Sequence, residues 1–326
     1  MSITLEQLWE ESRFSPNPSQ FEAINHVDGP LFLPAGPGSG KTRVLLWRTV
    51  NLIVFHGVDP NEIFLSTFTE KAAFQLKQGL QSLLGLVTNH TNQPYDLSGM
   101  FIGTVHSLCQ RLITDRKYSP DKTRPRRPHV LDALSQYFHV SRFLREALPK
   151  YEFDHTTINR LFSRGDFVSE SRNNAINNAI NVFNRFSEDC LQSDDHIDSA
   201  DDLIVPMLTL YKDYRSSLVT NGGVMTDFSL LQAEALDLLE CHPESGSFFK
   251  HVIVDEYQDT NTIQERIFFK LAAQNKNLCV VGDDEQALYR FRGATVENFV
   301  EFPQRCLTYF DLAPREIPLN VNYRSR

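Results

Sequence analysis

A short apolar run leads into a glycine-rich turn and then into a helical pattern, and this feature constrains the chain more than any other. Residues 31–42 are Leu-Phe-Leu-Pro-Ala-Gly-Pro-Gly-Ser-Gly-Lys-Thr, and apolar residues recur at helical spacing over 44–52. Backbone N–H groups of such a loop, and of the helix after it, converge on phosphate oxygens, and glycines permit the close approach. The pattern predicts a nucleoside triphosphate site in which Lys41 reaches the β- and γ-phosphates and the Thr42 hydroxyl binds Mg²⁺. The loop residues that we expect to hold the nucleotide are Gly36, Gly38, Ser39, Gly40, Lys41 and Thr42.

The composition excludes several classes of protein. The chain has 326 residues, of which 41% are hydrophobic and 22% are charged, as in a soluble globular protein. Because no apolar run reaches the ~18–20 residues of a membrane span and the first residues are polar, we expect a cytoplasmic protein without a membrane partner. The net charge of −9 repels phosphate, so any contact with nucleic acid has to come from a local groove. The five cysteines include no CxxC pair, which argues against a disulfide framework or a zinc site.

Two parts of the chain alternate short apolar runs with helical patterns, which is typical of a parallel α/β sheet. The predicted strands are 31–33, 63–66, 100–102, 251–254 and 278–281, with a weaker candidate at 307–310. The middle of the chain is mostly helical in period, for example at Ile176, Ile180 and Phe183. We therefore expect a sheet domain in two parts, 1–115 and 225–326, with an inserted helical domain over 116–224.

Acidic residues follow the strand predicted at 251–254. In open α/β sheets ligands bind at the carboxyl ends of the strands, where Asp255 and Glu256 lie. In phosphate-loop enzymes an Asp at this place holds the Mg²⁺ shell, and a neighbouring Glu orients or deprotonates the attacking water. The alternative is a solvated corner, which the upstream phosphate loop disfavours.

Seven segments of the chain, which include the phosphate loop and the acidic strand end, occur in the order found in one family. The matching segments are Pro18-Ser19-Gln20, 35–43 (AGxGSGKTR), 67–73 (TFTxKAA), 103–107 (GTFHS), 254–261 (VDExQDTN), 282–294 (GDxxQxIYxWRGA) and 322–325 (NYRS). Val105 and Phe291 replace an aromatic residue and a tryptophan of the family pattern. The chain resembles the UvrD/Rep/PcrA-like helicases of superfamily 1A. The resemblance implies a RecA-like P-loop NTPase sheet with an inserted, mainly helical domain.

The resemblance also implies roles for single residues, with ATP and Mg²⁺ as cofactors. The residues that would hold the adenine are Gln20, Arg43 and Tyr323. The residues that would surround the phosphates and the metal are Lys41, Thr42, Asp255, Glu256, Gln286 and Arg324. The residues that would line a track for single-stranded DNA are Phe68, Thr104, His106, Tyr289, Phe291 and Arg292.

Two functions from different classes remain open at this point. The first is the N-terminal motor portion of an ATP-dependent 3′→5′ DNA helicase or translocase, which acts on single-stranded DNA. The second is an ATP-regulated module that binds DNA or a protein partner without motor activity. The sequence ends two residues after Arg324, where the family's second RecA-like domain begins. We therefore expect a C-terminal region or a partner to supply that domain, and we expect the chain alone to have weak activity or none.

A basic stretch lies where the sheet and the insertion meet. It consists of Arg111, Arg116, Lys117, Lys122, Arg124, Arg126 and Arg127. Contact with the DNA backbone and an ordinary solvated hinge are both open interpretations.

Overall fold

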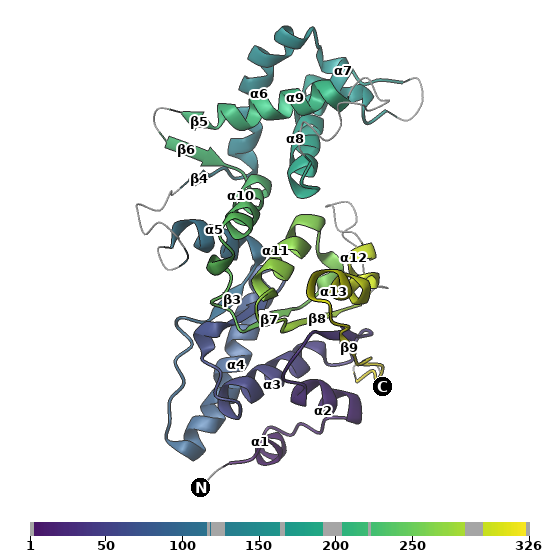
Figure 1. Cartoon of the computed structure of the whole chain (residues 1–326). Coiled ribbons are helices and arrows are strands. Elements are labelled where there is room, and N and C mark those ends of the chain that lie inside the picture. Colours follow the sequence, from purple (N-terminus) through teal and green to yellow (C-terminus); the bar gives the residue numbers. More distant parts are fainter. Residues whose placement is uncertain are drawn as a thin grey trace. The chain divides into compact units, whose positions relative to one another are not determined.

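The chain folds into two compact units (Figure 1). The structure is a computed structural model and describes residues 3–115, 118, 128–163, 167–191, 204–220, 223–283 and 296–323. Unit 1 consists of Met1–Arg111 and Leu238–Arg326, and unit 2 consists of Leu112–Asp237. Two helices contain residues of both units, namely α5 (Val105–Thr114) and α10 (Phe228–Cys241).

The described part of unit 1 contains a six-stranded sheet of order β3-β2-β7-β8-β1-β9. All neighbouring strands pair in parallel. The strands are β1 (Leu31–Pro34), β2 (Ile63–Ser66), β3 (Phe101–Gly103), β7 (His251–Val254), β8 (Leu278–Gly282) and β9 (Arg315–Glu316). The predicted parallel α/β sheet is confirmed, with each of the five firm strand predictions within one residue of its observed bounds. In this order all carboxyl ends lie at one edge of the sheet, so the residues after β1, β2, β7 and β8 are gathered there.

Successive strand residues point to opposite faces of the sheet, and both faces are covered. Leu31 and Leu33 belong to a core formed with the helices of one face. Those helices are α1 (Leu5–Glu11), α2 (Pro18–Asn25), α3 (Lys41–Val54) and α4 (Glu70–Thr91). Phe32 contacts Phe299 and Phe302 on the other face, with ring centroids 4.9 and 5.4 Å apart. The helices of that face are α11 (Thr262–Ala272), α12 (Val296–Val300) and α13 (Phe302–Phe310) (Figure 1).

The weak strand predicted at 307–310 is wrong, because these residues end helix α13. Phe302, Cys306 and Phe310 are buried at a spacing of four residues, which is a helical repeat. Pro303, in the first turn, is compatible with a helix start. The apolar face therefore decides the structure over the β-propensity of residues 307–310.

Unit 2 is mainly helical, with a small sheet of order β4-β6-β5 among its described residues. Its other α-helices and strands are α6 (Ala133–Ala147), α7 (His155–Arg160), α8 (Arg172–Glu188), α9 (Ile204–Ser217), β4 (His129–Val130), β5 (Val219–Thr220) and β6 (Gly223–Thr226), and a short 3-10 helix covers Leu148–Tyr151. The helix predicted around Ile176, Ile180 and Phe183 is confirmed as α8, whose apolar face packs in the core of this unit. The assignment of 116–224 as an inserted domain of the helicase type remains a prediction.

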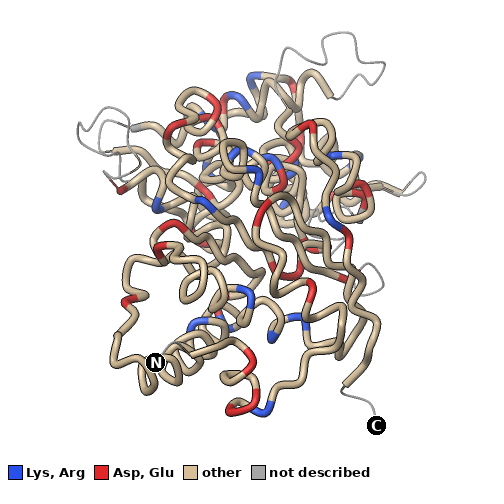
Figure 2. The backbone as a smooth tube through the Cα atoms, turned by 60° about the horizontal axis from the view of Figure 1, so that its bottom comes forward, with Lys and Arg blue, Asp and Glu red and all other residues tan. Residues whose placement is uncertain are grey.

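Charged residues of both signs are interspersed over the described parts of the chain (Figure 2). Within those parts, no helix combines the length and the apolar character needed to cross a membrane.

Candidate nucleotide-binding site

The glycine-rich loop joins β1 to α3 and leaves the start of α3 uncapped. Gly38 and Gly40 adopt φ values of 74° and 80°, which glycine reaches without strain. Gly40 is the N-cap of α3 and offers no side-chain acceptor to the first turn. Four other helices of unit 1, α1, α2, α4 and α11, all have such an acceptor, from Thr4, Asn17, Thr69 and Asn261. Because the first N–H groups of a helix have no acceptor within it, the N-terminus of α3 is suited to phosphate oxygens.

Lys41 lies beside the carboxylate that follows β7. Its Nζ is 3.2 Å from Oε2 of Glu256. The same carboxylate accepts a hydrogen bond of 2.7 Å from Nε2 of Gln258, and Oε1 of Gln258 accepts one of 3.0 Å from the backbone N–H of Asp283. Gln258 therefore connects Glu256 to the end of β8. A Cβ at Gly282 would lie 2.4 Å from Oε1 of Gln258 and 2.7 Å from Cε2 of Phe299, so a side chain here would displace the Gln258 amide or the Phe299 ring.

Asp255 is buried next to Glu256. Its side chain accepts a hydrogen bond from the Glu256 N–H, and its exposed fraction is 6%. Burial and then the charge of Glu256 raise the pKa of Asp255 to about 7, against the opposing effect of Lys41. The pKa of Asp259 is raised to about 6, first by burial and then by Glu256. A cation at this edge of the sheet would favour the charged form of both carboxyl groups.

Several polar atoms near this edge are buried without a hydrogen-bond partner among the described residues. They are Ser39 Oγ, Ser66 Oγ, Thr67 Oγ1 and Asp259 Oδ1. Ser66 ends β2, and its carbonyl accepts a hydrogen bond from the N–H of Asp255. Buried polar groups are normally satisfied, so this set of hydroxyl and carboxylate oxygens fits a site for a hydrated cation and phosphate.

A magnesium ion here would depend partly on the nucleotide. Within the described residues, no group of three or more His, Cys, Asp or Glu side chains is arranged to hold a metal. Mg²⁺ commonly takes one or two protein oxygens together with substrate phosphates and water. Thr42 and Asp255, the predicted ligands, fit that pattern.

Gln20 and Tyr323 lie against the phosphate loop. Gln20 is 2% exposed, and its Nε2 donates to the carbonyl of Ser39 at 3.0 Å. The N–H of Tyr323 donates to the carbonyl of Gly38 at 2.9 Å. Asn17 joins the two, because its N–H donates to Oε1 of Gln20 and its Nδ2 donates to the hydroxyl of Tyr323.

Asn17 contacts two predicted site residues, Gln20 and Tyr323, although it lies outside the matching segments. Its side chain accepts from the N–H of Gln20, which completes a capping box at the start of α2. The spacing Asn-x-x-Gln before a helical pattern is the sequence signal of such a box and could have identified it.

Arg43 contacts the turn that follows α1. Its Nη2 donates to the carbonyl of Ser12 at 3.0 Å, and its guanidinium lies 4.6 Å from the centroid of the Phe14 ring. Neither Ser12 nor Phe14 was a predicted site residue.

The predicted DNA-contacting residues Phe68, Thr104 and His106 follow the ends of β2 and β3, which are neighbouring strands. Oγ1 of Thr104 donates to Oε1 of Glu70 at 2.9 Å, and Oγ of Ser107 donates to the same oxygen at 3.0 Å. Burial lowers the pKa of His106, although Glu70 opposes the shift. Glu70 and Ser107 were inside the quoted motifs, but no role was predicted for them.

Some of the predicted site residues lie outside the described residues. They are Gln286, Tyr289, Phe291, Arg292 and Arg324.

Comparisons with known proteins match this chain over most of its length. The family described as "UvrD/REP helicase N-terminal domain" matches residues 16–306. The chain is 33% identical over 291 residues to "ATP-dependent DNA helicase PcrA" of Bacillus subtilis, which covers 88% of the chain and 35% of that protein. It is 30% identical over 324 residues to "ATP-dependent DNA helicase UvrD1" of Mycobacterium bovis, covering 95% of the chain and 37% of that protein. It is 31% identical over 313 residues to "DNA helicase II" of Haemophilus influenzae, covering 95% of the chain and 38% of that protein. The chain thus spans little more than a third of the length of these relatives.

Proposed function

This chain belongs to the UvrD/REP helicase family, and we propose that it is the N-terminal motor portion of an ATP-dependent DNA helicase or translocase. In this proposal it binds and hydrolyses ATP with Mg²⁺ while single-stranded DNA is bound. The 3′→5′ direction rests on the resemblance alone. Because the chain spans about a third of its relatives, the second RecA-like domain would come from a C-terminal region or a partner. Because DNA lies in the cytoplasm of bacteria such as those of these relatives, the protein would work in the cytoplasm.

The contact between Lys41 and Glu256 at the carboxyl edge of the sheet carries this proposal. Lys41 would bind the β- and γ-phosphate oxygens, together with the backbone N–H groups from Gly38 to Thr42, since Pro37 has no N–H. Thr42 and Asp255 would hold Mg²⁺, which neutralises the phosphate charge when it is bound. Glu256, freed from Lys41, would accept a proton from the attacking water. Gln286 and Arg324 would contact the γ-phosphate, a role assigned to them by the resemblance.

The adenine and the DNA would bind at separate places on unit 1. Gln20, Arg43 and Tyr323 would contact the adenine. Phe68, Thr104 and His106, with Tyr289, Phe291 and Arg292, would form the DNA track. The inserted domain over 116–224 would be the helical insertion of this family.

A test of the DNA part uses Phe68 and a matched phenylalanine. Stacking of a base on an aromatic ring is worth about 1–3 kcal/mol, so Phe68→Ala should weaken single-stranded DNA binding by about 5- to 10²-fold. Phe74→Ala is the control, because Phe74 is a 61% exposed aromatic of α4 outside the predicted track. Fluorescence anisotropy of a labelled oligonucleotide measures both. If a track contacts about four phosphates, affinity should fall about 50-fold between 50 and 200 mM salt.

The same purified chain should not separate the strands of a duplex. A correctly placed arginine from another domain is worth about 10³–10⁵ in the rate of phosphoryl transfer, so residues 1–326 alone should hydrolyse ATP very slowly. ATP-dependent strand displacement by residues 1–326 would contradict the two-domain motor. Equal DNA affinity of the Phe68→Ala and wild-type chains would contradict the predicted track.

A further inference from the structure

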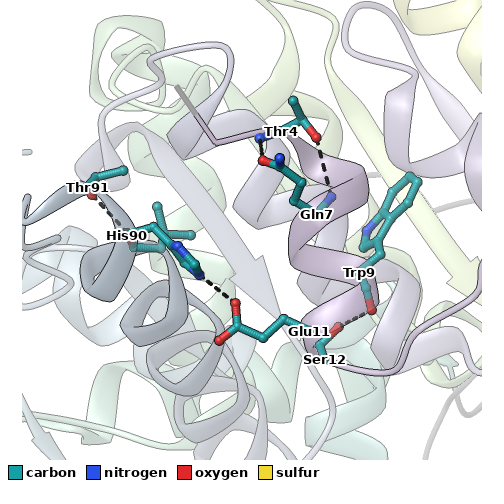
Figure 3. Close-up of polar contacts among 8 residues, drawn as sticks. Thr4, Gln7, Trp9, Glu11, Ser12, His90 and Thr91 are labelled. Carbon is teal, nitrogen blue, oxygen red and sulfur yellow. Dashed lines mark hydrogen bonds and ion pairs between the residues drawn. The ribbon is translucent and has the colours of Figure 1, made fainter. Parts of the chain in front are cut away.

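The N-terminal segment Ile3–Phe14 is firmly attached to unit 1, although the family match begins only at residue 16. Thr4 and Gln7 form a capping box at the start of α1, with hydrogen bonds of 3.3 and 3.0 Å. At the other end of α1, Glu11 pairs with His90 near the end of α4, at 2.6 Å (Figure 3). Leu5, Leu8 and Trp9 are buried in the core of unit 1. The segment is therefore held to unit 1 along one face and at the end of α1.

The turn after α1 places a carbonyl and an aromatic ring against Arg43. The hydroxyl of Ser12 donates to the carbonyl of Trp9 at 3.1 Å, as Figure 3 shows, and the N–H of Phe14 donates to the same carbonyl at 2.8 Å. Arg13 takes a positive φ of 51° between them. In this turn the carbonyl of Ser12 accepts the hydrogen bond from Arg43, and the Phe14 ring lies against the Arg43 guanidinium.

Phe14 is itself fixed by tryptophans. It is 8% exposed and lies parallel to Trp47, with ring centroids 5.9 Å apart and an interplanar angle of 7°. Trp47 follows Arg43 by four residues on α3, so both side chains lie on the same face of that helix. Trp9 packs edge-on against both Phe14 and Trp47. The result is a rigid support of three rings under one exposed guanidinium.

An arginine held in this way retains binding capacity. A guanidinium has five N–H donors and two flat faces, and the contacts with Ser12 and Phe14 use one donor and one face. A free arginine side chain loses rotamer entropy when it binds a ligand, and prior ordering removes much of that cost. Lys41, Thr42 and Arg43 are the first three residues of α3, so Arg43 lies in the same helix turn as the residues that would bind the phosphates.

We propose that Phe14, with the backbone carbonyl of Ser12, positions Arg43 for the adenine base, so that the segment Ile3–Phe14 is part of the nucleotide site. This inference rests on the proposed function, because it takes Arg43 as an adenine contact. Phe14 is a positioning residue and does not touch the nucleotide. Its effect is therefore confined to ligands that carry a base.

The test compares ATP with inorganic tripolyphosphate as ligands of the purified chain, measured by calorimetry with Mg²⁺. Phe14→Leu keeps most of the buried volume but removes the aromatic face. It should weaken ATP binding by about 3- to 10-fold, from the lost cation–π contact and the lost ordering of Arg43. Tripolyphosphate affinity should stay unchanged, which also shows that the variant is folded. Phe14→Tyr should retain the ATP affinity. Phe55→Leu is the matched control, because Phe55 lies at the far end of α3 from Arg43.

A double-mutant cycle separates this inference from the proposed function. If Phe14 acts through Arg43, Phe14→Leu should have no further effect in a chain that already carries Arg43→Ala. Additive effects, or an equal loss of ATP and tripolyphosphate affinity, would overturn the positioning role. If Arg43→Ala weakens ATP binding and Phe14→Leu does not, the inference is wrong and the adenine site stands. If the wild-type chain does not bind ATP, the proposed function itself is wrong.

Discussion

Replacing Lys41 by Ala should weaken ATP binding by about 10- to 10²-fold or more and leave the chain folded. Hydrogen bonds from a charged donor are worth about 1.5–3 kcal/mol each, and tenfold in affinity corresponds to 1.4 kcal/mol. The chain should stay folded because the Lys41 ammonium lies beside the phosphate loop and is not packed in an apolar core. Glu256 also keeps its hydrogen bond from Gln258 in the variant. Calorimetric titration with Mg-ATP measures the affinity, and thermal unfolding measures the stability.

The chain offers a matched control for this variant. Lys250 also pairs with a glutamate, Glu62, at 2.8 Å, but on strand-flanking residues away from the phosphate loop. Lys250→Ala should leave the ATP affinity unchanged. Unchanged affinity in Lys41→Ala would contradict the assignment of the loop.

Replacing Glu256 by Gln should preserve Mg-ATP binding and slow hydrolysis by about 10²–10⁴-fold. This range is the usual contribution of a positioned general base, and an amide of the same shape is a very poor base. Lys41 loses its carboxylate partner in this variant, but the phosphates provide charge for it when ATP is bound. Single-turnover hydrolysis of radiolabelled ATP measures both rates in the full-length protein, which supplies the second RecA-like domain that the proposal requires.

Two further variants would test whether the slower hydrolysis is specific to the loss of the Glu256 carboxylate. Glu62→Gln removes the carboxylate of the surface pair with Lys250 and should not change hydrolysis. Asp255→Asn should instead weaken the dependence on Mg²⁺, because Asp255 is one of the two proposed metal ligands. Hydrolysis at the wild-type rate in Glu256→Gln would exclude Glu256 as the base.

The order of elements around the phosphate loop could be predicted because its determinants are adjacent in the chain. The apolar run, the glycines with positive φ and the uncapped helix start all lie within residues 31–42, and the structure has β1 and α3 on either side of the loop. The acidic pair after β7 was predictable for the same reason, since a buried strand and its end form one local pattern.

The contacts that organise the site were not predictable, because they join distant parts of the chain. Asn17 can contact Tyr323 because β9 pairs with β1 at the edge of the sheet and brings the end of the chain close to α2. Gln258 contacts the end of β8, and Arg43 contacts Ser12, through tertiary packing. Such contacts have no characteristic residue spacing that could be recognised in the sequence. The error at 307–310 has a similar cause, since the burial of Phe302 and Cys306 against the sheet outweighs local β-propensity.

A crystal structure of the chain with Mg²⁺ and a non-hydrolysable ATP analogue tests the central claim most directly. The account predicts the triphosphate at residues 36–42, with Lys41 moved from Glu256 to the phosphates. It also predicts Mg²⁺ on Thr42 and Asp255, and the base against Gln20, Arg43 and Tyr323. A triphosphate bound elsewhere, with Lys41 still paired to Glu256, would contradict it.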